Sequence, residues 1–158
     1  MGQSSTLICS KCGYSIGYRE GIGMFHPHYC KKILQDMKEG KEGEVFQKYA
    51  NELKNPAINM EYALFRCDSC NELKAGSILE ICEQVAEYPQ DRSHGWRGVD
   101  KMENFPMARS GVHKTVYSLP HPCKCGKEMR PVDRDDALSC PHCGTILTTA
   151  PHMSMYWD

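Results

Sequence analysis

Eight cysteines occur in four close pairs, and this spacing is typical of metal binding. Three pairs enclose two residues, and the pair at Cys123 and Cys125 encloses one. Cysteines this close lie on one tight turn, so their thiolates can bind one ion, and two such turns supply a tetrahedral shell of four sulfurs. The predicted metal ligands are Cys9, Cys12, Cys67, Cys70, Cys123, Cys125, Cys140 and Cys143.

Each pair is followed directly by a residue that tolerates a positive φ, as the chain needs when it turns over a metal. These residues are Gly13, Asn71, Gly126 and Gly144. Four such turns in one short chain are a strong signal, whereas one alone would be weak. Because closed shells of four cysteines are typical of structural zinc, we expect two Zn²⁺ ions.

Spacing along the chain also predicts which turns share an ion. Residues 126–139 connect the third and fourth pairs and suffice for one short hairpin. By elimination the first two pairs share the other ion, so residues 13–66 must contain an insertion. The expected sets are Cys123, Cys125, Cys140 and Cys143 for one ion, and Cys9, Cys12, Cys67 and Cys70 for the other.

The pair at Cys123 and Cys125 is the least regular of the four, because only Lys124 separates its cysteines. We expect both thiolates to bind metal despite this spacing. His121 is the obvious substitute ligand if one of them cannot reach the ion.

The segments around the turns predict both strands and helices. Apolar residues at three- and four-residue steps predict helices within residues 25–53, and the Gly-containing segment 38–43 separates them. Alternating residues predict strands at 61–66 and 112–119, each leading into a cysteine pair. Residues 78–82 fit either a helical face or a short strand.

The expected fold class is α+β, with two small antiparallel zinc-ribbon units, the first carrying a helical insertion between its two turns. Residues 1–88 would form the first unit and residues 112–158 the second, with its tail. The polar segment 89–111 contains several Gly and Pro residues and is predicted to be a linker or exposed loop.

The cysteine turns resemble those of the zinc-ribbon, or rubredoxin-knuckle, superfamily. The string Cys140-Pro141-His142-Cys143-Gly144 also resembles small uncharacterised bacterial proteins with a C-P-x-C-G motif. The resemblance covers about half of the chain and implies metal binding and little else, because zinc ribbons serve many functions. Since rubredoxins bind iron at similar turns, iron is the minor alternative to zinc.

A second group of metal-binding residue types lies near the predicted helices. His26, His28 and Cys30 could form a third, open site together with Cys82 or His94, and an enzyme function would depend on it. No second ligand pair has a fixed spacing to these residues, so we favour buried cysteines and helix-capping histidines instead. The four-cysteine shells are closed and leave no position for substrate, which argues against catalysis.

The overall charge and the absence of membrane signals narrow the classes of partner. The chain carries 19 basic and 20 acidic residues and no long basic run, which disfavours general nucleic-acid binding. It shows no signal peptide and no apolar stretch long enough to span a membrane, so we expect a soluble cytoplasmic protein without membrane contact.

We therefore expect a zinc-binding adaptor or regulatory protein that acts through protein–protein contacts. A nucleic-acid-binding zinc ribbon in transcription or translation is the alternative, and a metal-dependent or redox enzyme is the second. Aromatic and arginine residues are enriched in binding hot spots, although they can also anchor a loop or tail on the surface. The candidate partner-binding residues are Trp96, Arg97, Tyr156 and Trp157.

Overall fold

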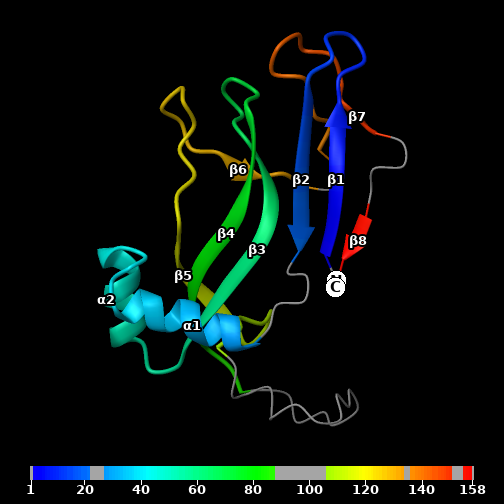
Figure 1. Ribbon diagram of the computed structural model, residues 1–158. Coiled ribbons are helices and arrows are strands. Elements are labelled where there is room, and N and C mark those ends of the chain that lie inside the picture. Colours follow the sequence, from blue (N-terminus) through cyan, green and yellow to red (C-terminus); the bar gives the residue numbers. More distant parts are fainter. Residues whose placement is uncertain (1, 22–26, 88–105, 134–135, 151–154, 158) are drawn as a thin grey trace. The chain divides into compact units, whose positions relative to one another are not determined.

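The computed structural model describes residues 2–21, 27–87, 106–133, 136–150 and 155–157 (Figure 1). Antiparallel strands predominate and two helices accompany them, so the α+β class is confirmed. The chain forms two compact units, each built from separated segments. Unit 1 comprises Met1–Met24, Met60–Ile78 and Leu119–Asp158, and unit 2 comprises Phe25–Asn59 and Leu79–Ser118.

Unit 1 begins with a regular antiparallel hairpin of β1 (Gly2–Ile8) and β2 (Ser15–Gly21), paired along their whole length. The other edge of β1 pairs with two short strands near the end of the chain, β7 (Thr148–Thr149) and β8 (Met155–Trp157). Residues far apart in the sequence therefore form one sheet at this edge.

A second hairpin consists of β3 (Pro56–Arg66) and β4 (Leu73–Gln84), and both strands contribute residues to both units. In unit 1 the strand β6 (Arg130–Pro131) pairs with the end of β3, and β2 meets β3 at the Gly21↔Tyr62 pair. The strand order in unit 1 is β4–β3–β2–β1–β7.

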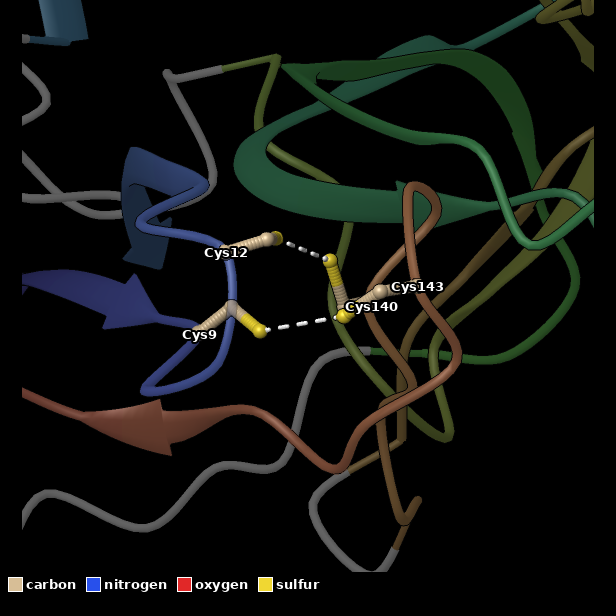
Figure 2. Close-up of side chains that lie close together, drawn as sticks. All are labelled: Cys9, Cys12, Cys140 and Cys143. Carbon is tan, nitrogen blue, oxygen red and sulfur yellow. Dashed lines mark hydrogen bonds between the residues drawn. The ribbon is translucent and has the colours of Figure 1, made fainter.

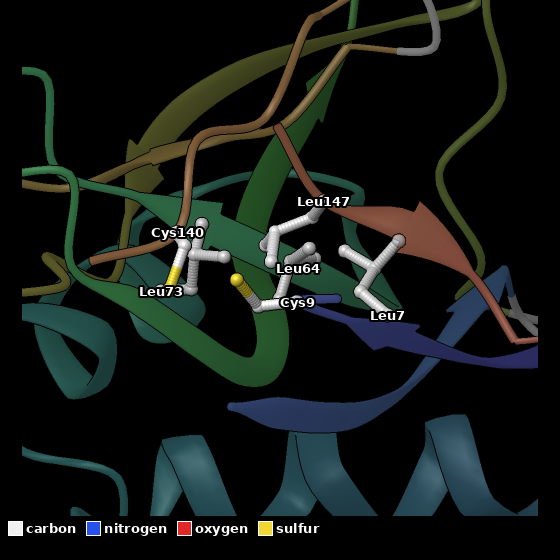
Figure 3. Packing of buried hydrophobic residues seen from close by; sticks show 6 residues of the cluster. All are labelled: Leu7, Cys9, Leu64, Leu73, Cys140 and Leu147. Carbon is white, nitrogen blue, oxygen red and sulfur yellow. The ribbon is translucent and has the colours of Figure 1, made fainter. Parts of the chain in front are cut away.

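Two consecutive residues of β3 serve two different apolar clusters, because successive side chains of a strand point to opposite faces. Leu64 packs with Leu73, Leu7 and Leu147 around Cys9 and Cys140 (Figure 3). Its neighbour Phe65 packs with Met129 around Cys67 and Cys123. Each pair of cysteine turns in unit 1 thus has a small core of its own.

Unit 2 contains the helices α1 (Pro27–Lys38) and α2 (Glu44–Glu52). Proline suits the first position of α1, where its missing N–H costs nothing. Buried residues recur at helical spacing on both helices: Cys30, Ile33, Met37, Phe46 and Ala50. Gly40 and Gly43 adopt positive φ values of 80° and 101° between the helices. The predicted pair of helices and the break between them are confirmed.

The helices of unit 2 accompany a small sheet in which β4 pairs with both β3 and β5 (His113–Ser118). The ring of Phe46 on α2 meets the ring of Tyr117 on β5 edge to face, with centroids 4.9 Å apart. Residues 78–82 belong to β4 and are therefore strand rather than helix. Strands also occupy the predicted segments 61–66 and 112–119, although β3 begins earlier, at Pro56.

The predicted arrangement of two consecutive zinc-ribbon units is not confirmed, because unit 1 combines segments from the beginning, middle and end of the chain. Most of the predicted linker, residues 88–105, lies outside the described residues, and its role stays a prediction. None of the helices in the described part of the chain is long and apolar enough to cross a membrane.

Candidate metal centres

Four sulfur atoms converge at each of two sites in unit 1, and in each site all ligand atoms lie within 4.8 Å of one another. The outer site consists of Cys9, Cys12, Cys140 and Cys143 (Figure 2). The inner site consists of Cys67, Cys70, Cys123 and Cys125. The eight paired cysteines are therefore those that the sequence predicted, but they are grouped differently.

The sulfur positions fit a tetrahedral ion. Sγ–Sγ distances are 3.4 Å for Cys9 and Cys143 and 3.5 Å for Cys12 and Cys140 in the outer site. The inner site has matching 3.5 Å distances between its two turns. A tetrahedron with metal–sulfur bonds of about 2.3 Å has edges of about 3.8 Å, which lies between these distances and the 4.8 Å limit. Each site can hold one metal ion in a closed shell of four thiolates.

The predicted grouping of the turns is wrong, and the strand pairing gives the reason. The residues after Cys143 continue into β7, whose register on β1 is Ile8↔Thr148, and this brings Cys140 and Cys143 beside Cys9. The residues after Cys125 continue into β6, which pairs with β3 just before Cys67. The third and fourth turns therefore join different strands and do not share an ion, despite their short connection.

The four turns share one backbone design. In the turn at Cys9, the N–H of the cysteine donates to the carbonyl of Tyr14 (2.8 Å), and the N–H of Gly13 donates back to the carbonyl of Cys9 (3.0 Å). The turns at Cys67 and Cys140 repeat this pattern. The residue after each second cysteine has a positive φ, between 57° at Asn71 and 80° at Gly126. The prediction about these four positions is confirmed.

The irregular turn at Cys123 is the same design shortened by one residue. Its first cysteine donates to the carbonyl of Lys127 (2.8 Å), and Gly126 donates to the carbonyl of Cys123 (2.9 Å). Each bond spans one residue fewer than in the other turns, and both sulfurs still face those of the turn at Cys67. His121 is not needed as a substitute: its ring stacks on Phe65, with centroids 3.7 Å apart.

The two cysteines of each turn differ in exposure. The first is buried in every case, with relative exposures of 6% or less. The second is exposed at Cys12 and Cys125 and intermediate at Cys70 and Cys143. Each ion would therefore lie between a small apolar core and the surface, held from inside by cysteines that are part of that core.

Hydrogen bonds favour one thiolate in each site. The pKa of Cys143 is lowered to about 6, first by the hydroxyl of Thr145 and second by the backbone N–H of the same residue. The hydroxyl oxygen lies 3.4 Å from the Cys143 sulfur. Burial acts to raise the pKa of Cys67, but backbone N–H groups at Cys70 and Ser69 lower it to about 7. Because metals bind thiolates rather than thiols, these two cysteines are prepared for ligation near neutral pH.

Charged side chains that the sequence analysis did not single out brace the inner site. Arg130 of β6 donates two hydrogen bonds to Asp136, of 2.7 and 3.2 Å. It donates a third, of 3.0 Å, to Asp68, which lies between Cys67 and Cys70 in the sequence. Lys124 lies 2.7 Å from Glu72 and links the two turns of the site. The sequence gives no signal for the pairs Arg130–Asp68 and Lys124–Glu72, because their partners lie far apart in the chain.

The residues considered for a third metal site are only partly described by the structure. Cys30 and Cys82 are buried in unit 2, with relative exposures of 1% and 2%. Burial raises the pKa of both thiols. His26 and His94 lie outside the described residues and the side chain of His28 is not described, so the third metal site stays a prediction. Within the described ranges, clusters of metal-ligating side chains are confined to the outer and inner sites.

The four candidate partner-binding residues are only partly placed. Trp96 and Arg97 lie outside the described residues. Tyr156 and Trp157 belong to β8, whose backbone pairs with β1 opposite Gln3 and Gly2. Their role in binding a partner stays a prediction.

Comparison with known proteins adds no relative: no protein-family model, no curated protein and no solved structure matches this chain. The functional interpretation therefore depends on the two cysteine sites and their surroundings.

Proposed function

We propose that this chain is a zinc-binding intracellular adaptor or regulatory protein that acts through protein–protein contacts. The observation that carries the proposal is the closed set of four thiolates at each site. An ion with four protein ligands has no position for water or substrate, so its contribution is to stabilise the fold. Thiolate shells of this kind suit zinc, with iron as the minor alternative.

The state of the cysteines supports an intracellular setting. The ten cysteines form no disulfide, and eight of them face one another in the two sites. Reduced thiols persist in cytosolic proteins and are rare in secreted ones. We therefore propose a cytoplasmic location.

The metal part of the proposal is tested by elemental mass spectrometry of protein purified without added metal. We expect two zinc ions per chain. Iron in both sites would contradict the zinc assignment and favour a redox function. A third ion would favour the open site at His26, His28 and Cys30.

The binding part is tested by cross-linking in cells, followed by reconstitution from purified components. We expect one defined protein to form a stoichiometric complex that survives nuclease treatment and is lost in Cys140→Ser. Cys82→Ser is the matched control, since Cys82 is equally buried but belongs to neither site. A complex that disappears with nuclease would favour the nucleic-acid alternative and contradict the adaptor proposal.

A further inference from the structure

The strand β2 has an open edge within unit 1, formed by Ser15–Tyr18. The strand pairs with β1 along its whole length but meets β3 only at the Gly21↔Tyr62 pair. Among the described residues, no strand pairs with Ser15–Tyr18 on the side away from β1. Ser15 and Gly17 are exposed. An edge of this kind offers backbone N–H and C=O groups to a further strand.

The register on β1 shows which backbone groups point outward at the open edge. The N–H of Cys9 donates to the carbonyl of Tyr14, so these two residues form a hydrogen-bonded pair beside the turn. Such pairs alternate with non-hydrogen-bonded pairs along antiparallel strands, so Gly17 directs its N–H and C=O away from β1. Its partner Thr6 fits this alternation, since the Thr6 carbonyl accepts a hydrogen bond from Ala150 on the opposite edge of β1.

The edge strand of unit 2 is protected against further pairing, whereas the open edge of β2 is not. The register of β5 on β4 shifts between Ile81 and Cys82, and the exposed Lys114 lies on β5. Bulges and lysines of this kind keep other strands from pairing with an edge. Ser15–Tyr18 contain no charged residue and no proline, and their register on β1 is continuous. The open edge of β2 therefore suits a partner strand.

The two faces beside the open edge differ in polarity. Ile16 and Tyr18 are partly buried and pack against the apolar cluster around Leu7. Ser15 and Gly17 lie on the other face and are exposed, because successive side chains of a strand point to opposite faces. A strand added to this edge would place apolar side chains beside Ile16 and Tyr18 and small polar side chains beside Ser15 and Gly17.

From these features we propose that an extended segment of a partner protein adds to β2 as an antiparallel strand. Main-chain hydrogen bonds to Ser15 and Gly17 supply affinity, and alternating apolar and polar side chains supply specificity. The antiparallel direction follows the pairing of β1 with β2, β7 and β8. It places polar residues of the partner directly opposite Ser15 and Gly17, because opposite residues share a face. This inference rests on the proposed adaptor function and names its contact surface.

Peptide binding to the metal-loaded full chain tests the proposal, with a short capped peptide that alternates threonine and valine as the probe. We expect the N–H of Gly17 to become protected from hydrogen exchange when the peptide is added, as measured by amide NMR. Methylating the threonine amide nitrogens should weaken binding at least about tenfold, because these groups face β2. Methylating the valine amide nitrogens is the matched control and should leave binding unchanged, since these groups face away from β2.

Two variants at Gly17 test the same edge from the side of the protein. Gly17→Pro removes the outward N–H without removing a hydrogen bond to β1, and it should also weaken peptide binding at least about tenfold. Gly17→Ala keeps this N–H, and its Cβ would meet only Thr6 Oγ1, at 3.7 Å, so it should bind normally. Bound metal is measured in both variants, and if Gly17→Pro loses metal, the methylated peptides decide the question.

Other results overturn the proposal. Absence of peptide binding at millimolar concentration would do so, and so would protection of β5 in place of Gly17 or equal losses with both methylated peptides. A cellular complex that forms equally well with Gly17→Pro would contradict the open edge as its contact surface and leave the adaptor function intact. Peptide binding by a chain that forms no complex in cells would contradict the adaptor function alone.

Discussion

The outer and inner sites are built from turns of the same backbone design, but they enclose very different lengths of chain. Cys9 and Cys143 of the outer site are 134 positions apart, and Cys67 and Cys125 of the inner site are 58 apart. Loop-closure entropy grows only logarithmically, so the longer loop costs about 0.7 kcal/mol more. Because structural zinc contributes about 10–16 kcal/mol, the length of the enclosed chain is a minor term. Short spacing was therefore a poor guide to which turns share an ion.

The two sites also differ in their surroundings. The outer site joins the beginning of the described chain to its end, and its ion would fix the edge formed by β1 and β7. The inner site lies within that span and has charged braces on its turns, at Arg130 and Lys124. We therefore predict that loss of metal destabilises both sites, and that loss of an ion pair at Arg130 or Lys124 destabilises the inner site.

Removal of both ions should have the largest effect. A strong chelator is expected to unfold unit 1, because each site replaces a large apolar core and contributes on the order of 10 kcal/mol. The helices of unit 2 contain none of the paired cysteines, and we expect their amide signals to change less. Two-dimensional amide NMR with and without chelator measures both regions. Preserved signals of β1 and β2 in the metal-free protein would contradict a structural role.

Single cysteine substitutions should separate the two sites. We expect Cys140→Ser to reduce bound metal from two ions to one, and adding Cys9→Ser should remove no more, since both belong to the outer site. Combining Cys140→Ser with Cys67→Ser should remove both ions. Native mass spectrometry gives the count, and Cys82→Ser should retain both ions. One remaining ion in the Cys140→Ser, Cys67→Ser variant would show that these cysteines share a site.

Alanine at the positive-φ glycines should cost a similar amount in both sites. A Cβ at Gly144 or Gly126 meets nothing within 4 Å, so the cost is that of the left-handed backbone alone. We expect each substitution to destabilise the metal-loaded protein by about 1–2 kcal/mol in urea unfolding. A much larger cost at Gly126 would indicate that the shortened turn is more strained than the others.

Loss of an inner-site brace should have the smallest effect. Arg130 lowers the pKa of Asp136 to about 2, so this carboxylate stabilises the fold above its ordinary pKa near 3.8 and ceases to do so as pH falls through about 2. Asp136→Asn should therefore be slightly destabilising at pH 7, where the thiolates can still hold metal. Because the pair is at the surface, high salt should reduce the difference. Urea unfolding of both proteins at pH 7 in low and in high salt measures the difference, and equal stability of the two proteins in low salt would contradict the prediction.

Local sequence was sufficient for much of the fold. The positive φ after each second cysteine follows from Gly or Asn at that position, as at Gly13 and Asn71. The helices follow from apolar spacing and from the glycines between them. These features depend on residues within one turn of chain, so their physical causes are present in a short stretch of sequence.

The partners of the turns were decided only by the tertiary structure. Whether the turn at Cys140 meets the turn at Cys9 or the one at Cys123 depends on which strand edge accepts β7, and that edge belongs to β1. Leu64 and Phe65 are both buried but on opposite faces of β3, which gives each site its own core. The sequence by itself determined the four metal-binding turns, because each is a local backbone motif. Long-range strand pairing determined their grouping, because chain length between ligands costs too little to select one partner over another.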